Sequence, residues 1–591
     1  MRTPPALGAL VEPGGVRFRV WAPAADRVDV VLDGRTGGLR PAPLDATGDG
    51  YFEAFVGGAA PGDRYRIALD GGDPFPDPAS RYQPEGVHGP SEVVDSGAFA
   101  WTDGDWTPPA LEDLVVYELH VGTFTPSGTF DGVRGKLSAL RDLGVTAVEL
   151  MPVADFPGER GWGYDGAALY APAHAYGRPD DLRRLVDVAH AEGLAVLLDV
   201  VYNHLGPDGA YLAAFGPVFT GKHETPWGRA MNLDDAGSRG VRDFFLDNAA
   251  HWLREYHLDG FRLDATHALV DDSDPHFLAE LSALVGGLAP PRLLVAEDHR
   301  NDARLVAPRP AGYGLDAVWA DDLHHQVRNV VAGDTEGYYA DFAGTTAAEI
   351  AETLRRGWFY DGRPTKRTGE ARGTSADGVR REQCVVCVQN HDQVGNRPTG
   401  ARLHHEVPAA AYRAATALLL VAPETPMLFM GQEWAASAPF PFFSDHNDEL
   451  GPLVTAGRKR EFEDFPGFRG DVPDPQAEAT FRSAVLDWSE RDAPGHRHTL
   501  ALTRALLALR PALGDPAAAT VEAVGDGALV VRRGPYTALV DLVGGAALPL
   551  ADGAEVVLST ESADHAPDPA PPERAGGAVR FSRPGALVAR A

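Results

Sequence analysis

The sequence is poor in cysteine, lacks long apolar runs and has too few basic residues to balance its acidic ones. Its two cysteines, Cys384 and Cys387, lie in the apolar segment QCVVCVQN. Residues three apart on a strand point to opposite faces, so this spacing favours neither a disulfide nor a zinc clamp, and the sequence has no second cysteine pair to complete a zinc site. We expect both cysteines to be small buried hydrophobic side chains.

The absence of long apolar runs and the shortage of basic residues restrict the cellular location and the binding partners that we expect. No stretch reaches the roughly 20 apolar residues of a membrane helix, and the opening MRTPPALGALVEPGG has no basic-then-apolar signal pattern. With 53 Lys and Arg against 84 Asp and Glu, the formal charge of −31 repels nucleic acid and anionic lipid. We therefore expect a cytoplasmic protein with neutral ligands and with neither nucleic acid nor membrane as a partner. The oligomeric state stays open, with a monomer favoured.

A chain of 591 residues exceeds one ordinary core, and its patterns divide it into three parts. Alternating apolar and polar residues in VRFRVW, followed by RVDVVL, predict an antiparallel, immunoglobulin-like β-sandwich over residues 1–95. The segments ALVVRRG and YTALVDLV predict a second β-sandwich over residues 513–591. Residues 96–512 between them have a different pattern.

This central part repeats a helix, a glycine and an apolar strand. In LRRLVDVAHAEG, the side chains of Leu182, Leu185, Val186 and Ala189 fall on one helical face, and Gly193 suits a left-handed cap. The almost wholly apolar strand that follows is typical of parallel β/α units that are buried on both faces. Eight such strands predict an α/β fold, a (β/α)8 TIM barrel with insertions. We place them at residues 115–119, 146–151, 195–200, 260–264, 293–297, 315–319, 385–389 and 426–430.

Charged residues at the ends of these strands indicate an active site, because strand ends converge at the mouth of a barrel. On GFRLDATH, Arg262 and Asp264 point to the same side, and the arginine would hold the aspartate ionised. Glu297 ends the apolar strand LLVAE, where partial burial would raise the pKa of its carboxyl group. Asp392 closes VVCVQNHD. Three such carboxyls suit glycoside cleavage with a nucleophile, an acid/base and a stabilising group.

Each of these residues has an alternative structural interpretation when it is taken alone. Asp199 would serve equally as a helix cap. His204 and His267 would serve as hydrogen-bonded core histidines. Arg262 and Asp264 would form an ordinary buried ion pair. The four strand ends, occurring together in one barrel order, favour the catalytic interpretation.

Four segments, DVVYNH, GFRLDATH, LLVAED and QNHDQVGNR, resemble in order and spacing the signature regions of the α-amylase superfamily, glycoside hydrolase family 13. The resemblance covers the whole barrel. It implies a retaining mechanism in which Asp264 is the nucleophile, Glu297 the acid/base and Asp392 the stabiliser of the transition state.

The resemblance also implies which residues hold the sugar that is cleaved. Arg262 would support the nucleophile, and His204 and His391 would grip the sugar. Tyr164 in GWGYDG would stack on the same ring, whereas Trp162 has packing as its alternative role. The residues that we expect to bind substrate in this part of the site are Tyr164, His204, Arg262, His267, His391 and Trp162.

The substrate is indicated by two further segments. The leading sandwich resembles the carbohydrate-binding module carried by branching enzymes, debranching enzymes and trehalohydrolases. The segment from Gly431 to Phe462 resembles the trehalohydrolases, which implies hydrolysis of an α-1,4 bond in maltooligosyl trehalose and release of trehalose from glucan-derived chains. Its Trp434, Asp445 and His446 suit binding of a sugar pair, with packing against the barrel rim as the alternative.

Two other functions stay open. A branching enzyme, acting on α-1,4-glucan oligosaccharides, would share this layout but pass the glycosyl unit to a glucan hydroxyl. A non-catalytic glucan-binding protein on a degenerate barrel is disfavoured by the complete set of carboxyls. We expect no cofactor and no metal: many α-amylases bind calcium through the asparagine equivalent to Asn203, but here Asp208 is the only carboxylate of the following insertion before Glu224. Asn203 is therefore expected to be structural.

Overall fold

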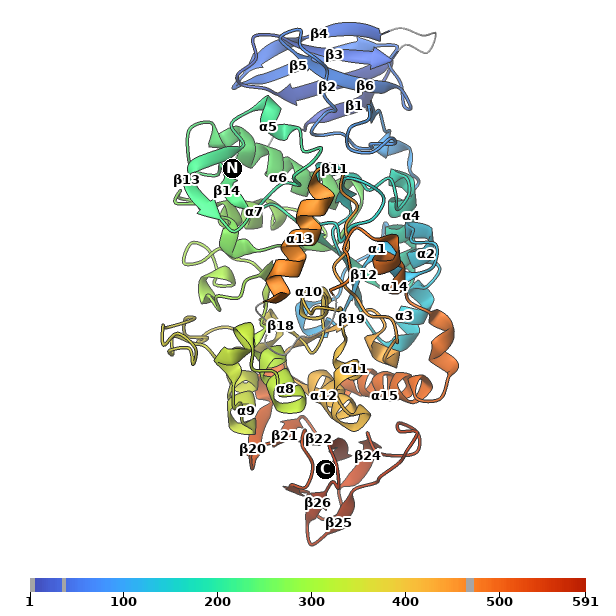
Figure 1. Ribbon diagram of the computed structural model, residues 1–591, viewed down its shortest axis with the longest axis vertical. Helices are drawn as coiled ribbons and strands as arrows, with labels where there is room; N and C mark the ends of the chain where they lie inside the picture. Colours follow the sequence, from blue (N-terminus) through green and yellow to red (C-terminus); the bar gives the residue numbers. More distant parts are fainter. Residues whose placement is uncertain (1–5, 34–38, 464–471) are drawn as a thin grey trace.

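The computed structural model describes residues 6–33, 39–463 and 472–591. A β-sheet unit lies at each end of its long axis, and a closed barrel with its helices lies between them (Figure 1). This arrangement confirms the predicted fold class, a TIM barrel flanked by two β units. Among the described residues, none of the helices is long and apolar enough to cross a membrane.

The N-terminal unit contains seven antiparallel strands in the order β1-β2-β5-β4-β3-β6-β7. In β2, Val16, Phe18 and Val20 are buried while Arg17 and Arg19 are partly exposed, as the alternating pattern predicts. The strands are β1 Gly8–Glu12, β2 Gly15–Trp21, β3 Val28–Asp33, β4 Leu39–Gly48, β5 Tyr51–Gly57, β6 Arg64–Leu69 and β7 Ser91–Glu92.

The barrel closes in the order β12-β15-β16-β17-β18-β19-β8-β9, and all of its strand pairs are parallel. All eight predicted strands are present, with ends that differ from the predicted ones by two residues or fewer. They are β8 Val116–Leu119, β9 Ala147–Leu150, β12 Ala195–Val200, β15 Gly260–Leu263, β16 Leu293–Glu297, β17 Ala317–Trp319, β18 Cys384–Cys387 and β19 Thr425–Phe429. Both cysteines of β18 are free and buried, as predicted.

Helices surround the barrel and bury their apolar faces against it. In α4, the predicted face of Leu182, Leu185, Val186 and Ala189 is buried, and Gly193 just beyond the helix has a φ of 78°. The helices are α1 Val121–Phe124, α2 Phe130–Arg134, α3 Leu137–Leu143, α4 Pro179–Ala191, α6 Ser238–Glu255, α7 Phe277–Val285, α8 Asp322–Ala332, α9 Ala347–Arg356, α10 His391–Gly395, α11 Leu403–Glu406, α12 Ala409–Val421 and α15 His496–Leu509.

Three insertions follow barrel strands and surround the mouth. After β12 come the short helix α5 and the β13–β14 hairpin; between β17 and β18 the chain continues past α8 through residues 337–373; after β19 it forms α13 and α14. In Figure 1, α13 crosses in front of the barrel. The remaining bounds are α5 Leu212–Phe215, α13 Leu450–Glu463, α14 Glu478–Ser483, β10 Ala154–Asp155, β11 Ala168–Pro172, β13 Phe219–Thr225 and β14 Gly228–Met231.

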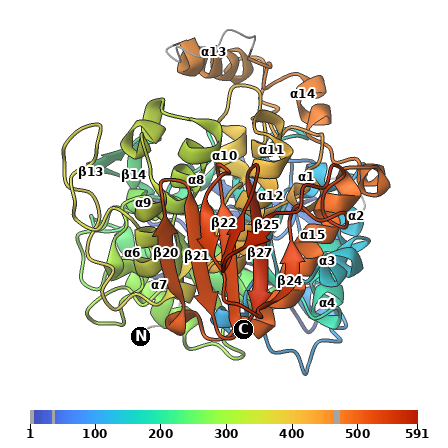
Figure 2. The same ribbon diagram turned by 90° about the horizontal axis from the view of Figure 1, so that it is seen from below.

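The C-terminal unit pairs a five-stranded sheet, β20-β21-β22-β27-β24, with a three-stranded sheet, β23-β26-β25. Figure 2 shows the larger sheet spread across the end of the barrel domain. Arg413 of α12 donates hydrogen bonds of 2.8 and 2.9 Å to Glu561, and both side chains are buried. The strands are β20 Thr520–Val524, β21 Ala528–Arg533, β22 Tyr536–Asp541, β23 Ala547–Pro549, β24 Glu555–Ser559, β25 Glu573–Ala575, β26 Ala578–Arg580 and β27 Gly585–Arg590.

Helix α6 joins the N-terminal unit to the barrel through its acidic side chains. Arg81 forms an ion pair of 2.6 Å with Glu255, and the Tyr51 hydroxyl donates to Asp243 at 3.0 Å. The backbone N–H of Leu7 donates to Asp247 at 2.9 Å. The N-terminal unit is therefore docked on the barrel by polar contacts. Polar groups that are shielded from water need a hydrogen-bond partner, and each side of this junction supplies partners for the other.

Candidate active site

A single arginine organises the carboxyl groups at the barrel mouth. Nη1 of Arg262 lies 2.8 Å from Asp199 Oδ2 and 2.7 Å from Asp264 Oδ1, and Nη2 lies 3.7 Å from Glu297 Oε2. Burial alone would lower the pKa of Arg262, but the neighbouring carboxylates outweigh it and raise this pKa well above its usual value. The predicted contact between Arg262 and Asp264 is thus present, within a larger cluster that also includes Asp199.

Glu297 ends β16 with its side chain next to this cluster. Its Oε2 accepts a hydrogen bond of 2.6 Å from the backbone N–H of Ala265, a residue in the left-handed region with a φ of 40°. Burial raises the pKa of Glu297 to about 8, and the charges of Asp264 and Asp392 add to the effect against that of Arg262. This carboxyl group is protonated at neutral pH, as the sequence predicts, and it is able to donate a proton.

Asp392 and His391 follow β18 at the first turn of α10. The side chain of Asp392 is 38% exposed, and its Oδ1 lies 3.4 Å from His391 Nε2. The Tyr164 hydroxyl donates to Asp199 at 2.5 Å and lies 2.8 Å from the same His391 nitrogen. The rings of Tyr164 and His391 are stacked with centroids 5.1 Å apart. Asp392 is therefore the most accessible carboxylate of the cluster, with His391 on one side.

His204 and His267 lie on the opposite side of the mouth, beside a residue that the sequence reasoning missed. His204 Nε2 contacts the carbonyl oxygen of Tyr164 at 3.0 Å, and its ring stacks on Trp227 at 5.1 Å with 4° between the planes. Nδ1 of each histidine is buried without a hydrogen-bond partner among the described residues. Trp227 is 49% exposed at the tip of the β13–β14 hairpin. The signal for this residue in the sequence was a tryptophan within the otherwise polar segment HETPWGR.

The aromatic residues predicted near the substrate have different environments. The Trp162 ring stacks on Phe440 at 5.2 Å and meets His391 edge-on at 5.6 Å, so it packs behind the histidine. Trp434 is fully buried and packs against Trp488 at 5.1 Å. The prediction that Trp434 offers a ring face to a sugar is wrong, because both of its faces are covered by the core.

Asp445 and His446 of the loop after β19 contact the loop after β9. Asp445 forms an ion pair of 2.6 Å with Arg160, and His446 Nε2 lies 3.3 Å from Asp165. These contacts hold the loop after β19 against the loop between β10 and β11, which itself carries Tyr164. A role for Asp445 and His446 in binding substrate stays a prediction.

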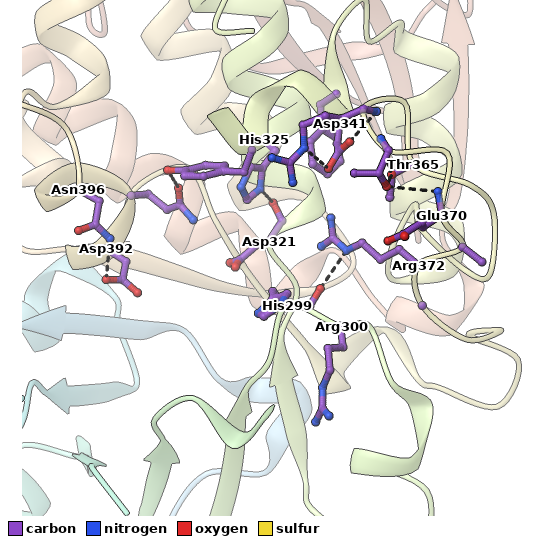
Figure 3. Close-up of a pocket in the computed structure, with 17 residues that line it drawn as sticks. His299, Arg300, Asp321, His325, Asp341, Thr365, Glu370, Arg372, Asp392 and Asn396 are labelled. Carbon is purple, nitrogen blue, oxygen red and sulfur yellow. Dashed lines mark hydrogen bonds and ion pairs between the residues drawn. The ribbon is translucent and has the colours of Figure 1, made fainter. Parts of the chain in front are cut away.

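A cavity of about 640 Å³ opens beside Asp392 and extends beneath the insertion of residues 337–373. Figure 3 shows Asp392 and Asn396 at one end, Glu370 and Arg372 at the other, and Asp321 between them. Burial and the charge of Asp392 raise the pKa of Asp321 to about 7. The sequence reasoning missed this cavity because the parts of the insertion that line it, residues 338–342 and 365–373, lie outside helix α9 and have no repeating apolar pattern.

Asn203 is buried, and its side-chain oxygen and nitrogen have no hydrogen-bond partner among the described residues. Within the same residues, the His, Cys, Asp and Glu side chains close enough to share a metal ion are His223, Asp234 and Asp272. Lys222 Nζ lies 2.7 Å from Asp234 and 3.0 Å from Asp272, so an ammonium group already neutralises this cluster.

Comparison with known proteins assigns the class of this barrel. Residues 94–216 match the family of the alpha amylase catalytic domain, and residues 6–84 match carbohydrate-binding module 48, the isoamylase N-terminal domain. A putative alpha amylase from Salmonella typhimurium superimposes with a TM-score of 0.89 at 37% identity, covering 99% of this chain and 100% of that one. The fold is that of an α-amylase-type glycoside hydrolase.

Curated relatives narrow the assignment further. The malto-oligosyltrehalose trehalohydrolase of Deinococcus radiodurans is 51% identical over 512 residues, which are 85% of this chain and 82% of the relative. The protein of the same name from Arthrobacter ramosus is 45% identical over 89% of this chain and 92% of its own length. The chain belongs to the malto-oligosyltrehalose trehalohydrolase family.

Proposed function

We propose that this chain hydrolyses the α-1,4-glucosidic bond next to the terminal trehalose unit of maltooligosyl trehalose and releases trehalose. Membership of the family supports the substrate. The observation that carries the chemistry is the arrangement around Arg262, which pairs with Asp264 at 2.7 Å while Glu297 stays protonated beside it. One anionic and one neutral carboxyl group are what a retaining glycosidase needs before it binds substrate.

The proposed reaction has two steps. Asp264 attacks the anomeric carbon while Glu297 donates its proton to the glycosidic oxygen, so that trehalose leaves and a glycosyl–Asp264 ester forms. Glu297, now ionised, then takes a proton from water, and the resulting oxygen nucleophile attacks the same carbon and releases Asp264. Both steps invert the carbon, and the product therefore retains the α configuration.

The remaining residues bind and stabilise the sugar in this proposal. Asp392, as the exposed carboxylate, faces the positive charge that develops on the ring. Tyr164 offers a ring face, His204 borders the sugar, and His391 lies beside Asp392 with its charge close to the ring that is cleaved. His267 borders the same space, with its ring 6.4 Å from that of Trp227. The cavity of about 640 Å³ beside Asp392 is large enough for a disaccharide and is lined by polar side chains.

The test is product analysis on two substrates in parallel, maltooligosyl trehalose and amylose. We expect free trehalose from the first, together with a maltooligosaccharide whose new reducing end is α when NMR is recorded immediately. Appearance of α-1,6 branches without trehalose would identify a branching enzyme instead. Saturable glucan binding without any hydrolysis would identify a glucan-binding protein.

Three further statements belong to this proposal. We propose the domain bounds 1–95, 96–512 and 513–591, because the polypeptide changes from antiparallel sheet to barrel and back near these positions. A cytoplasmic location and a monomeric state remain predictions. Sedimentation of the purified chain at several concentrations measures the oligomeric state.

A further inference from the structure

Two glutamates lie side by side on neighbouring barrel strands, outside the four signature segments. Glu118 of β8 pairs in register with Glu149 of β9, so that both side chains point to the same side of the sheet. Glu118 is 1% exposed and Glu149 is 2% exposed. Buried carboxyl groups are costly unless they are paired or protonated, so each of them calls for a physical reason.

Glu118 is paired with His391. Its Oε2 accepts the backbone N–H of His391 at 2.8 Å, and its Oε1 contacts Nδ1 of the imidazole. A carboxylate accepts hydrogen bonds and does not donate them, so Nδ1 carries a hydrogen. One carboxyl group thereby fixes both the backbone and the ring of His391.

The other ring nitrogen carries a hydrogen as well. His391 Nε2 lies 2.8 Å from the Tyr164 hydroxyl, and that hydroxyl donates its single hydrogen to Asp199 at 2.5 Å. Asp199 is held as an acceptor by Nη1 of Arg262 at 2.8 Å. Because Tyr164 has no second hydrogen to give, its oxygen accepts from Nε2, and His391 is an imidazolium with two N–H donors.

We propose that Glu118 is a positioning residue, which holds His391 as an imidazolium so that its Nε2–H bonds Tyr164 and its positive charge lies beside Asp392, where the sugar binds. The proposal rests on the proposed function, because it gives the imidazolium a role in holding the sugar. Glu118 itself lies beneath His391 and touches no substrate.

The charges around His391 agree with this assignment. Burial lowers the pKa of its imidazole, but Glu118 and Asp392 outweigh burial and raise this pKa to about 9, against the opposing charge of Arg262. His120 also faces His391, and burial lowers the pKa of His120 to about 4, so it is neutral.

Glu149 provides a matched control. Burial, followed by the charges of Glu118 and Asp199, raises the pKa of Glu149 well above its usual value and so favours the neutral form of its carboxyl group. Its Oε1 has no hydrogen-bond partner among the described residues. Glutamine therefore mimics Glu149 closely, whereas at position 118 it removes a charge and keeps the shape.

The first experiment compares Glu118→Gln and Glu149→Gln at pH 7, each also combined with His391→Ala. We expect kcat/KM to fall about 10- to 100-fold in Glu118→Gln, the range for loss of a hydrogen bond to a charged group, and less than about 2-fold in Glu149→Gln. In the His391→Ala background, Glu118→Gln should add less than about 2-fold, because its target is absent. Equal losses at the two glutamates, or additive losses with His391→Ala, would overturn the proposal.

The second experiment needs no activity. The pKa of His391 is about 9 in the folded protein and 6.5 for the free group, so its stabilisation is full below pH 6.5 and is lost as pH rises through 9. The amount by which wild type exceeds Glu118→Gln in Tm should therefore be larger at pH 6 than at pH 10, while Glu149→Gln stays at least as stable as wild type. A Tm difference for Glu118→Gln that is equal at the two pH values contradicts the proposal.

The two experiments separate this inference from the proposed function. If wild type cleaves amylose but releases no trehalose, the substrate assignment fails while the ranking of the variants on amylose still tests Glu118. If no glycosidase activity is found at all, the pH dependence of Tm decides whether Glu118 holds His391 as an imidazolium.

Discussion

Replacing Glu297 by glutamine separates the proton of this side chain from its shape. Glutamine keeps an oxygen that accepts the Ala265 N–H, which Glu297 now binds at 2.6 Å, but it neither ionises nor donates an acidic proton. We expect kcat on maltooligosyl trehalose to fall about 10³-fold or more, because both steps of the proposed reaction pass a proton through this group.

The same substitution should stabilise the folded protein at neutral pH. Burial raises the pKa of Glu297 to about 8, compared with 4.5 for an exposed glutamate. Below pH 4.5 the group is protonated in both states and has no effect, but as pH rises toward 8 the unfolded chain ionises while the folded one does not, and stability is lost. At pH 7 the loss amounts to at most about 3 kcal/mol at ~1.4 kcal/mol per pKa unit. Removing it raises Tm by roughly 3 °C for a domain of this size.

Calorimetry at pH 4.5 and pH 7, together with initial rates, tests both parts. The control is Glu478→Gln, whose side chain is 61% exposed and should change neither Tm nor rate. The reasoning is refuted if Glu297→Gln gains no more Tm over wild type at pH 7 than at pH 4.5. Retention of wild-type kcat would equally refute the catalytic assignment.

Three other substitutions test separate parts of the structure. Asp264→Asn should lower kcat about 10³-fold or more with the Tm preserved, because a covalent step is lost, and a trapped glycosyl intermediate of the wild type should be found by mass spectrometry on Asp264 and nowhere else. Trp227→Ala should raise KM about 5- to 10-fold with less effect on kcat, since the exposed ring stacked on His204 offers a face to a sugar; an unchanged KM would exclude this contact. Arg81→Ala should destabilise the protein by about 1.5–3 kcal/mol, because it removes the charged hydrogen bonds to Glu255 and leaves that carboxylate only His251 at 3.3 Å and Arg183 at 3.9 Å; a thermal unfolding midpoint equal to that of wild type would show that the pair is not needed for docking.

The sequence predicted the barrel because its signals are local. A buried parallel strand must be apolar along its whole length, and the helix that covers it must repeat its apolar residues at helical spacing, as in α4 with Leu182, Leu185 and Val186. Charged residues that end such strands then mark the mouth, which is how Arg262 and Glu297 were found. Glu118 has the same kind of signal, a charge inside the apolar segment VVYELHV. Nothing in that segment, however, indicates that its partner is His391.

The cavity that the insertions form could not be predicted from the sequence, because it depends on contacts between distant segments. Outside helix α9, residues 337–373 have no repeating pattern, and their side chains form the cavity beside Asp392 only after the chain has folded back on α8. Trp434 is a second example of a prediction that fails because it depends on distant contacts. Its aromatic-rich loop suggested an exposed ring, yet the fold buries it against Trp488, because burial depends on neighbours that are distant in sequence.

The sequence alone thus determined the fold class and the set of strand-end carboxyls, since both follow from patterns within single segments. Only the tertiary structure decided which of these groups meet: Arg262 bonds Asp199 across 63 residues, and His391 bonds Glu118 across 273. The protonation of Glu297 and His391 depends on burial and on charges from several strands at once. Electrostatic energies depend on distances in space, and no spacing along the chain contains them.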